Sequence, residues 1–423
     1  MTWLPKSVVC LSYYNRSRFR SDAFAAFLLS LQIFPLAIAI AVAIGVHPLY
    51  GVSCAAAAGL LVSIFGDSKI RVSAPNVIFV AVASGIVARE GILGLSLTTL
   101  LAGVLLMFFG AIHVGAAIQV LPRPVAVGFT TGIAVLIISE QLPNCFGLSS
   151  PIPTDQAGRA ALTAVRLVMD IKPHAIVLAF AALVLMVVCR RTLKHAPAGL
   201  FVVVIGAVLV RFGHFPVRTI ESLHGPSPMS PLHLAGVLGF NRFGRIVAPA
   251  FVIAVLVAIE ALQAMQVATG LTGESSNPDG ELFLQGGANL ASACVGSLPV
   301  SGVSSHTLEN VRLGAQTPVA GILQAFFLVL FLVLTAPLIR FIPLPMVSAL
   351  ILSSVFGMTK WREIPRLLKA ARFDGVAWVA ISLLTIFADL PVAIAVGMLI
   401  GMFLHIRKKS IVLGKAAPRD QRN

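Results

Sequence analysis

Runs of apolar residues long enough to span a lipid bilayer recur along the whole of this 423-residue chain. A membrane-spanning helix needs about 20 predominantly apolar residues. Hydrophobic residues make up 58% of the sequence and charged residues only 11%, whereas a soluble domain carries about 25% charged residues. Because helices satisfy their own backbone hydrogen bonds in lipid, the sequence predicts an all-α polytopic membrane protein.

The apolar runs predict about 14 transmembrane segments. The longest loop, 214–245, separates a first set over 22–213 from a second set over 246–406, with the same odd number of segments in each. An odd number makes the second set enter the membrane with opposite orientation, which is an inverted-repeat arrangement of about seven segments each. A cytoplasmic N-terminus, 1–21, and a short basic cytoplasmic tail, 407–423, complete the predicted organisation.

The chain is strongly basic, with 31 Lys and Arg residues against 16 Asp and Glu residues and a formal net charge of +15. Such a balance in a soluble protein would indicate nucleic acid, but basic residues also crowd the cytoplasmic loops of membrane proteins. With the N-terminus inside, the predicted segments place 22 of the 31 basic residues in the cytoplasm. We therefore expect both termini on the cytoplasmic side of the plasma (inner) membrane and no nucleic acid partner.

Two short polar interruptions occupy matching places in the two halves. The first is Val72–Asn76 (VSAPN) and the second is Pro299–His306 (PVSGVSSH). In lipid, non-helical backbone is tolerated only where it is buried in protein or lines a polar cavity. Paired interruptions of this kind are typical of a transporter site built on broken helices. We therefore predict half-helices at segments 3 and 10 that bind a small solute.

The two predicted half-helices begin near Asn76 and near Ser304, both at mid-membrane. The first turn of a helix has free backbone N–H groups and the positive end of the helix dipole. Two such ends that face each other form an anion site without a formal cation. Ser73 and Ser305 add side-chain donors at the two ends. The alternative is that these Ser and Asn side chains cap the helices, which uses the same geometry.

Three further polar residues fall within predicted spans. His306 is a candidate proton-sensitive cation at the site, or else a neutral imidazole hydrogen-bonded within the bundle. Glu260 stands in an apolar run, where a carboxylate by default marks a pathway or a proton relay; the alternative is a structural acid that ties helices together. Gln32 lies just before Pro35 in the first span, and it either faces the site or bonds a neighbouring helix.

The chain shows no phosphate-binding loop and no nucleophile with a matching base. Its five cysteines have neither metal-ligand nor disulfide spacing. We therefore expect neither an enzyme nor a metal or organic cofactor.

Several stretches, spread over most of the chain, resemble motifs of the SulP (sulfate permease) family of anion transporters. They are PLAIAI…GVHPLYG at 35–51, SAPN at 73–76, RPVAVGFTTG at 123–132, Glu260 followed by LTGESSN…QGGAN at 271–289, and RLGAQTPVAG at 312–321.

The resemblance implies a core domain and a gate domain, elevator-like alternating access, and an anion held between the third and tenth segments. It also implies homodimers, and exchange or cotransport of inorganic anions or carboxylates with H⁺ or Na⁺. By position, Pro75 and Asn76 match the family's third-segment site and Ser305 its tenth-segment site. Glu260 matches its eighth-span acid, which would carry the ion coupling.

Three features depart from the family pattern. His306 stands where the family usually has Arg, which would weaken anion binding or make it pH dependent. Asn76 stands where Thr or an aromatic residue is common, which would change substrate choice. No STAS domain follows the basic tail, so we expect a short family member or a STAS domain on a separate chain. The alternative is that the protein has lost transport along with the arginine that His306 replaces.

The sequence therefore predicts a secondary active transporter for a small anion such as sulfate, bicarbonate or a dicarboxylate, coupled to H⁺ or Na⁺. Gln32, Ser73, Pro75, Asn76, Ser304, Ser305 and His306 are the predicted substrate-binding residues, with Glu260 for ion coupling. One alternative is a nucleobase/H⁺ symporter, which shares the inverted fold and an acid in its eighth span. An anion channel and a non-transporting membrane scaffold are the others.

Overall fold

The computed structural model describes residues 5–119, 123–148, 171–193, 196–213, 215–223, 240–274, 276–359, 361, 363–369, 372–388 and parts of 392–401. The last residues of the second predicted set, which runs to 406, fall largely outside the described residues, and the predicted tail 407–423 falls wholly outside them.

Helices dominate the described chain, and seven of them are long and apolar enough to cross a membrane. Three shorter apolar helices accompany them. These helices agree with the predicted multi-pass membrane protein. The helical elements are α1 (Lys6–Leu11), α2 (Arg16–Ile44), α3 (Pro48–Phe65), η1 (Val77–Phe79), α4 (Val80–Ala111), α5 (Gly115–Gln119), α6 (Arg123–Cys145), α8 (Pro173–Thr192), α9 (Ala198–Gly213), η2 (Ile220–Ser222), α10 (Phe240–Thr272), α11 (Pro278–Val295), α12 (Ser304–Arg312), α13 (Val319–Ile339), α14 (Leu344–Met358), α15 (Ile364–Lys369) and α16 (Arg372–Phe387).

α4 is one element with a break inside it. Gly91 at the break has a φ of 72° and a ψ of −173°, which is not helical. Glycine adopts positive φ at little cost. The break therefore divides α4 into two helical parts.

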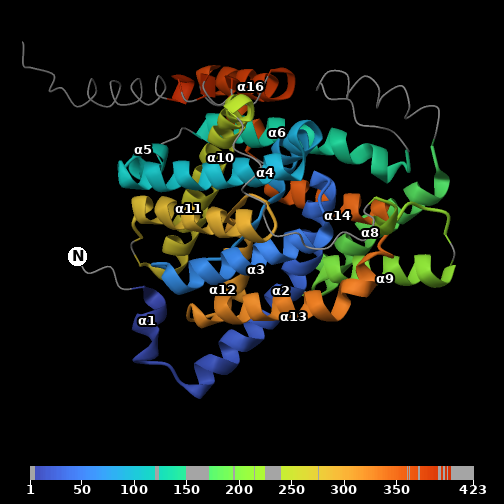
Figure 1. The fold of residues 1–423 in the computed structure, drawn as a ribbon, viewed down its shortest axis with the longest axis horizontal. Helices are drawn as coiled ribbons and strands as arrows, with labels where there is room; N and C mark the ends of the chain where they lie inside the picture. Colours follow the sequence, from blue (N-terminus) through green and yellow to red (C-terminus); the bar gives the residue numbers. More distant parts are fainter. Residues whose placement is uncertain are drawn as a thin grey trace, which may run out of the picture.

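Four helices from both halves of the chain form neighbouring layers. α4 packs on α11, α11 on α3, and α3 on α13 (Figure 1). The contact between α4 and α11 is close, since a Cβ added to Gly286 would lie 2.6 Å from the Gly103 carbonyl oxygen. Small residues are what allow helices to approach this closely in lipid. A second group of helices contains α6, which packs on α16 and α14, and α8, which packs on α14 and α9.

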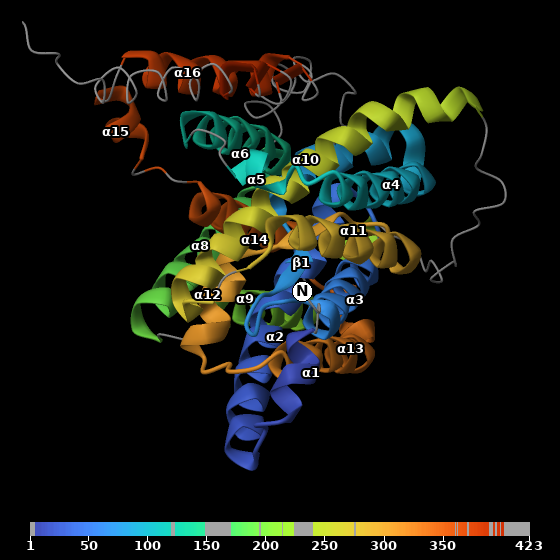
Figure 2. The ribbon, with the colours of Figure 1, turned by 90° about the vertical axis from the view of Figure 1, so that its left-hand side faces the viewer.

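A two-stranded antiparallel sheet lies near the centre of the molecule (Figure 2). β1 (Ser73–Pro75) pairs with β2 (Val300–Gly302), with Ser73 opposite Gly302 and Pro75 opposite Val300. These strands are the two polar interruptions, brought side by side. The sequence analysis did not predict this small sheet, because a three-residue strand is too short to show an alternating pattern.

Ion pairs at the helix ends join loops that the predicted topology places on the same side. Glu274 pairs with Lys6 at 3.3 Å and with Lys69 at 2.6 Å, all on the predicted cytoplasmic side. Arg245 pairs with Glu90 at 3.3 Å on the opposite side.

Removing the Glu274 carboxylate is expected to loosen α1. Burial works to raise the pKa of Glu274, but the hydrogen bond from Lys69 and the charges of Lys6 and Lys69 hold it below its ordinary value. A carboxyl of this kind adds stability above its unfolded-state pKa and loses it as the pH falls through its folded-state pKa. Exposed ion pairs contribute about 0.2–1 kcal/mol each, so Glu274→Gln should speed hydrogen exchange in α1 a few-fold at neutral pH.

The difference in exchange between Glu274→Gln and the unmodified protein should disappear in acid, once Glu274 of the unmodified protein is protonated and has lost its charge. Equal exchange at neutral pH would show that these ion pairs do not hold α1.

Candidate functional site

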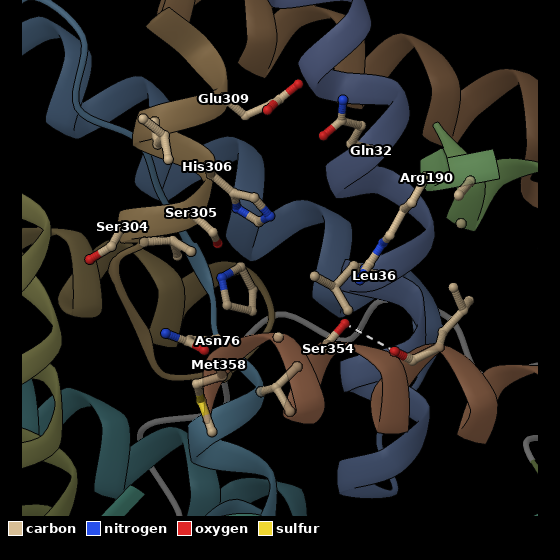
Figure 3. Close-up of a pocket in the computed structure, with 18 of the residues that line it drawn as sticks. Gln32, Leu36, Asn76, Arg190, Ser304, Ser305, His306, Glu309, Ser354 and Met358 are labelled. Carbon is tan, nitrogen blue, oxygen red and sulfur yellow. Dashed lines mark hydrogen bonds between the residues drawn. The ribbon is translucent and has the colours of Figure 1, made fainter. Parts of the chain in front are cut away.

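One cavity of about 610 Å³ receives the ends of both half-helices. Its wall contains six of the seven predicted substrate-binding residues together with the predicted coupling residue Glu260. These are Gln32, Pro75, Asn76, Ser304, Ser305 and His306. Figure 3 shows most of these side chains around the same space, with His306 and Ser305 on one wall and Gln32 above them.

Ser73 is the predicted site residue that does not line this cavity. It is fully buried, and its hydroxyl accepts a hydrogen bond of 2.8 Å from Nε2 of Gln285 on α11. Ser73 therefore holds β1 against α11 instead of facing the space between the half-helices.

Asn76 both caps its helix and contacts the acid of α10. Its Oδ1 accepts a hydrogen bond of 3.4 Å from the backbone N–H of Ile78 at the start of η1. Its Nδ2 donates a hydrogen bond of 3.0 Å to Oε2 of Glu260. Glu260 is 8% exposed, as expected for a carboxylate that faces a cavity within the protein. Asn76 therefore connects the first half-helix directly to the predicted coupling residue.

The N-terminus of α12 has no side-chain cap. The N–H of Val303 donates to the carbonyl of Val72 at 2.9 Å, across the sheet. The first hydrogen bond of the helix runs from the N–H of Thr307 to the carbonyl of Val303 at 2.9 Å. The three N–H groups before Thr307, from Ser304 to His306, therefore have no partner within the helix. All three residues line the cavity. A side-chain cap is therefore present at Asn76 and absent at the start of α12, where the first-turn N–H groups have no partner within the helix.

His306 points into the cavity beside Ser305 (Figure 3). Its Nδ1 is buried and has no hydrogen-bond partner among the described residues. One turn further on, Arg312 and Glu309 form an ion pair of 3.7 Å. The predicted bonding of His306 within the bundle is therefore not seen at Nδ1.

Side chains from α11 and α12 hold the two interruptions together. Asn289 of α11 bonds both backbone groups of Val300, accepting from its N–H at 3.0 Å and donating to its carbonyl at 2.8 Å. Oγ1 of Thr307 accepts from the N–H of Val72 at 3.2 Å, and Nδ2 of Asn310 donates to the carbonyl of Ile70 at 2.9 Å. These bonds fix both half-helix ends in one unit.

Sequence reasoning missed Gln285 and Asn289 as parts of this frame. Both lie on α11, one turn apart and fully buried. Two amide side chains with a spacing of four residues in an apolar helix were the available signal, because residues at that spacing share a helix face.

Replacing Asn289 with leucine is expected to destabilise the protein strongly. The change leaves the buried N–H and carbonyl of Val300 without their side-chain partner, and each such loss costs about 1–3 kcal/mol. We expect a clear fall in the midpoint of thermal unfolding in detergent and loss of the transport activity proposed below. An unchanged midpoint would mean that the Asn289 bonds do not hold β2.

The opposite wall of the cavity comes from α2, α8 and α14. Arg190 from the last turn of α8 and Ser354 from α14 line it, with Gln32 from α2. Arg190 is one of the 22 basic residues that the predicted topology places in the cytoplasm, and it was not among the predicted site residues. Figure 3 shows that its side chain reaches into the cavity.

Comparison with known proteins agrees with the motifs. Residues 19–381 match the family model described as the sulfate permease family. The "Putative sulfate transporter YvdB" of Bacillus subtilis is 31% identical over 400 residues, which is 94% of this chain and 75% of that protein. The "Bicarbonate transporter BicA" of Picosynechococcus is 26% identical over 415 residues, which is 92% of this chain and 71% of that protein.

Two solved structures share the fold. The transmembrane domain of a cyanobacterial bicarbonate transporter BicA superposes with a TM-score of 0.79 at 24% identity, covering 90% of this chain and 98% of that one. The murine anion transporter Slc26a9 in the inward-facing state superposes with a TM-score of 0.82 at 17% identity, covering 96% of this chain and 71% of that one. The resemblance found in the motifs is confirmed: the chain belongs to the sulfate permease family.

Proposed function

We propose that this protein is a secondary active transporter that carries a small anion, such as sulfate, bicarbonate or a dicarboxylate, across the membrane. The observation that carries the proposal is the meeting of two half-helix N-termini in one cavity inside a membrane protein. The family and the similar proteins are transporters and not enzymes.

In this proposal the backbone N–H groups of Ser304, Ser305 and His306 bind the anion from one side, and the end of the first half-helix at Pro75 and Asn76 approaches from the other. Helix N-termini favour anions through their free donors and the helix dipole. Gln32 adds a polar side chain from α2. Ser73 supports this site from behind through its bond to Gln285.

Glu260 is the proposed coupling residue. Its carboxylate bonds Asn76, so its charge lies beside one end of the anion site. A proton or Na⁺ bound at Glu260 removes the repulsion between this carboxylate and an anion. Each bound species then raises the affinity for the other, which is the linkage that cotransport requires.

The proposed movement is elevator-like. The half-helices belong to a core domain with α2, α3, α10, α11 and α13, and the gate domain contains α6, α8, α9 and α14. Inverted repeats over 22–213 and 246–406 are supported by matched packing, since α3 lies against α13 as α11 lies against α4. A homodimer with both termini in the cytoplasm of a plasma membrane completes the proposal.

Uptake into proteoliposomes tests the proposed function. Radiolabelled sulfate, bicarbonate and succinate would be supplied with and without H⁺ and Na⁺ gradients. Saturable uptake of one anion that follows one gradient supports the proposal. Uptake blocked by uracil or xanthine and not by the anions would favour a nucleobase symporter. Electrical currents far above the turnover rate of a carrier would favour a channel. Folded protein that shows no flux of any of these solutes would favour a membrane scaffold.

A further inference from the structure

Arg190 lies in the last turn of α8 and lines the same cavity as the two half-helix ends. Figure 3 shows its side chain extending toward the cavity centre from the wall opposite His306. Arg190 and its neighbour Arg191 are both exposed, but only Arg190 lines the cavity. Both arginines follow the preference for positive charge at a helix C-terminus, so that preference does not account for the direction in which Arg190 points.

Arg190 differs from the other charged groups of the cavity in its partners. Arg312 and Glu309 form an ion pair, and Glu260 accepts a hydrogen bond from Asn76. Among the residues that the structure describes, no carboxylate lies within ion-pair distance of Arg190. Its positive charge is therefore available to a ligand in the cavity.

The remainder of the site is poor in fixed positive charge. Each helix N-terminus contributes the equivalent of about half an elementary charge. His306 is positive only when it binds a proton, and Glu260 has the opposite sign when ionised. An arginine guanidinium stays charged and presents its N–H donors in a planar fork that matches two oxygens of an oxyanion.

We propose that Arg190 contacts the transported anion and supplies the permanent positive charge of its site, from the wall opposite the half-helices. This inference rests on the proposed transport function and identifies the ligand as an oxyanion with at least two accessible oxygens. α8 packs on α14 and α9, whereas α12 packs on α10 and α2. The anion is thus held between two groups of helices, and movement of one group past the other breaks the Arg190 contact and helps release.

The test compares Arg190→Gln with Arg191→Gln, a matched control on the next residue. The probe is whichever of radiolabelled sulfate, bicarbonate and succinate the unmodified protein carries. Charge-assisted bidentate contacts are among the strongest hydrogen bonds, so Arg190→Gln should raise KM about tenfold or more, while Arg191→Gln stays within about twofold. Arg190→Lys should be intermediate. Adding His306→Arg to Arg190→Gln should lower KM again, because it returns a fixed charge to the cavity.

Thermal unfolding without anion shows whether each variant is folded, and stabilisation by added anion measures binding independently of flux. Equal KM for Arg190→Gln and the unmodified protein would overturn the role of Arg190 and leave the transport function standing. An equal rise in KM in Arg190→Gln and Arg191→Gln would also overturn the role of Arg190. So would a KM that stays high when His306→Arg is added to Arg190→Gln. An unmodified protein that neither transports nor is stabilised by the three anions would overturn both proposals.

Discussion

Uptake of anion is expected to fall to background when Ser305 is replaced by tryptophan. Ser305 is exposed to the cavity in the first turn of α12, beside the three N–H groups that have no intrahelical partner. An indole ring there fills the space where the anion binds and covers these donors. The side chain enters an existing cavity, so the protein should still fold. Uptake into proteoliposomes and the midpoint of thermal unfolding give the two measurements.

Ser12→Trp is a suitable control, because Ser12 is exposed at the end of α1, far along the chain from the half-helices. It should keep normal uptake. If folded Ser305→Trp protein transported anion at the normal rate, α12 would not hold the substrate and the site assignment would be wrong.

Gradient-driven accumulation of anion is expected to disappear when Glu260 is replaced by glutamine. Glutamine keeps the size of the side chain and can still accept a hydrogen bond from Asn76, but it neither ionises nor binds a proton. Accumulation inside vesicles should therefore fall to the level reached without a gradient. Exchange of labelled for unlabelled anion should continue, because the half-helix donors remain.

The comparison of driven uptake with exchange separates coupling from binding at Glu260. Loss of both in folded protein would make Glu260 part of the anion site itself. Full dependence on the H⁺ or Na⁺ gradient in Glu260→Gln protein would exclude this residue as the coupling group.

The sequence predicted the helices and the two ends of the site because both depend on local signals. Long apolar runs define the spanning helices, and the breaks at 72–76 and 299–306 interrupt them with residues that a lipid-facing helix does not tolerate. Asn76, Ser305 and Glu260 lie at the cavity as predicted.

The pairing and direction of side chains could not be predicted in the same way. The pairing of β1 with β2 joins residues more than 200 positions apart, and no local pattern reports such a contact. A helix that is apolar on all sides has no hydrophobic face to orient it. Hydropathy alone therefore did not show that Ser73 faces Gln285, or that Arg190, and not Arg191, enters the cavity.

The most direct test of the central claim, that an anion binds between the two half-helix ends, is thiol modification at Ser305. The variant Ser305→Cys would be made with the exposed Cys294 replaced by serine, and its reaction with a small charged thiol reagent would be timed at increasing anion concentration. We predict that the transported anion slows the reaction, with half-maximal protection near the KM for uptake. A reaction rate unchanged at anion concentrations that saturate uptake would place the substrate elsewhere and contradict this account.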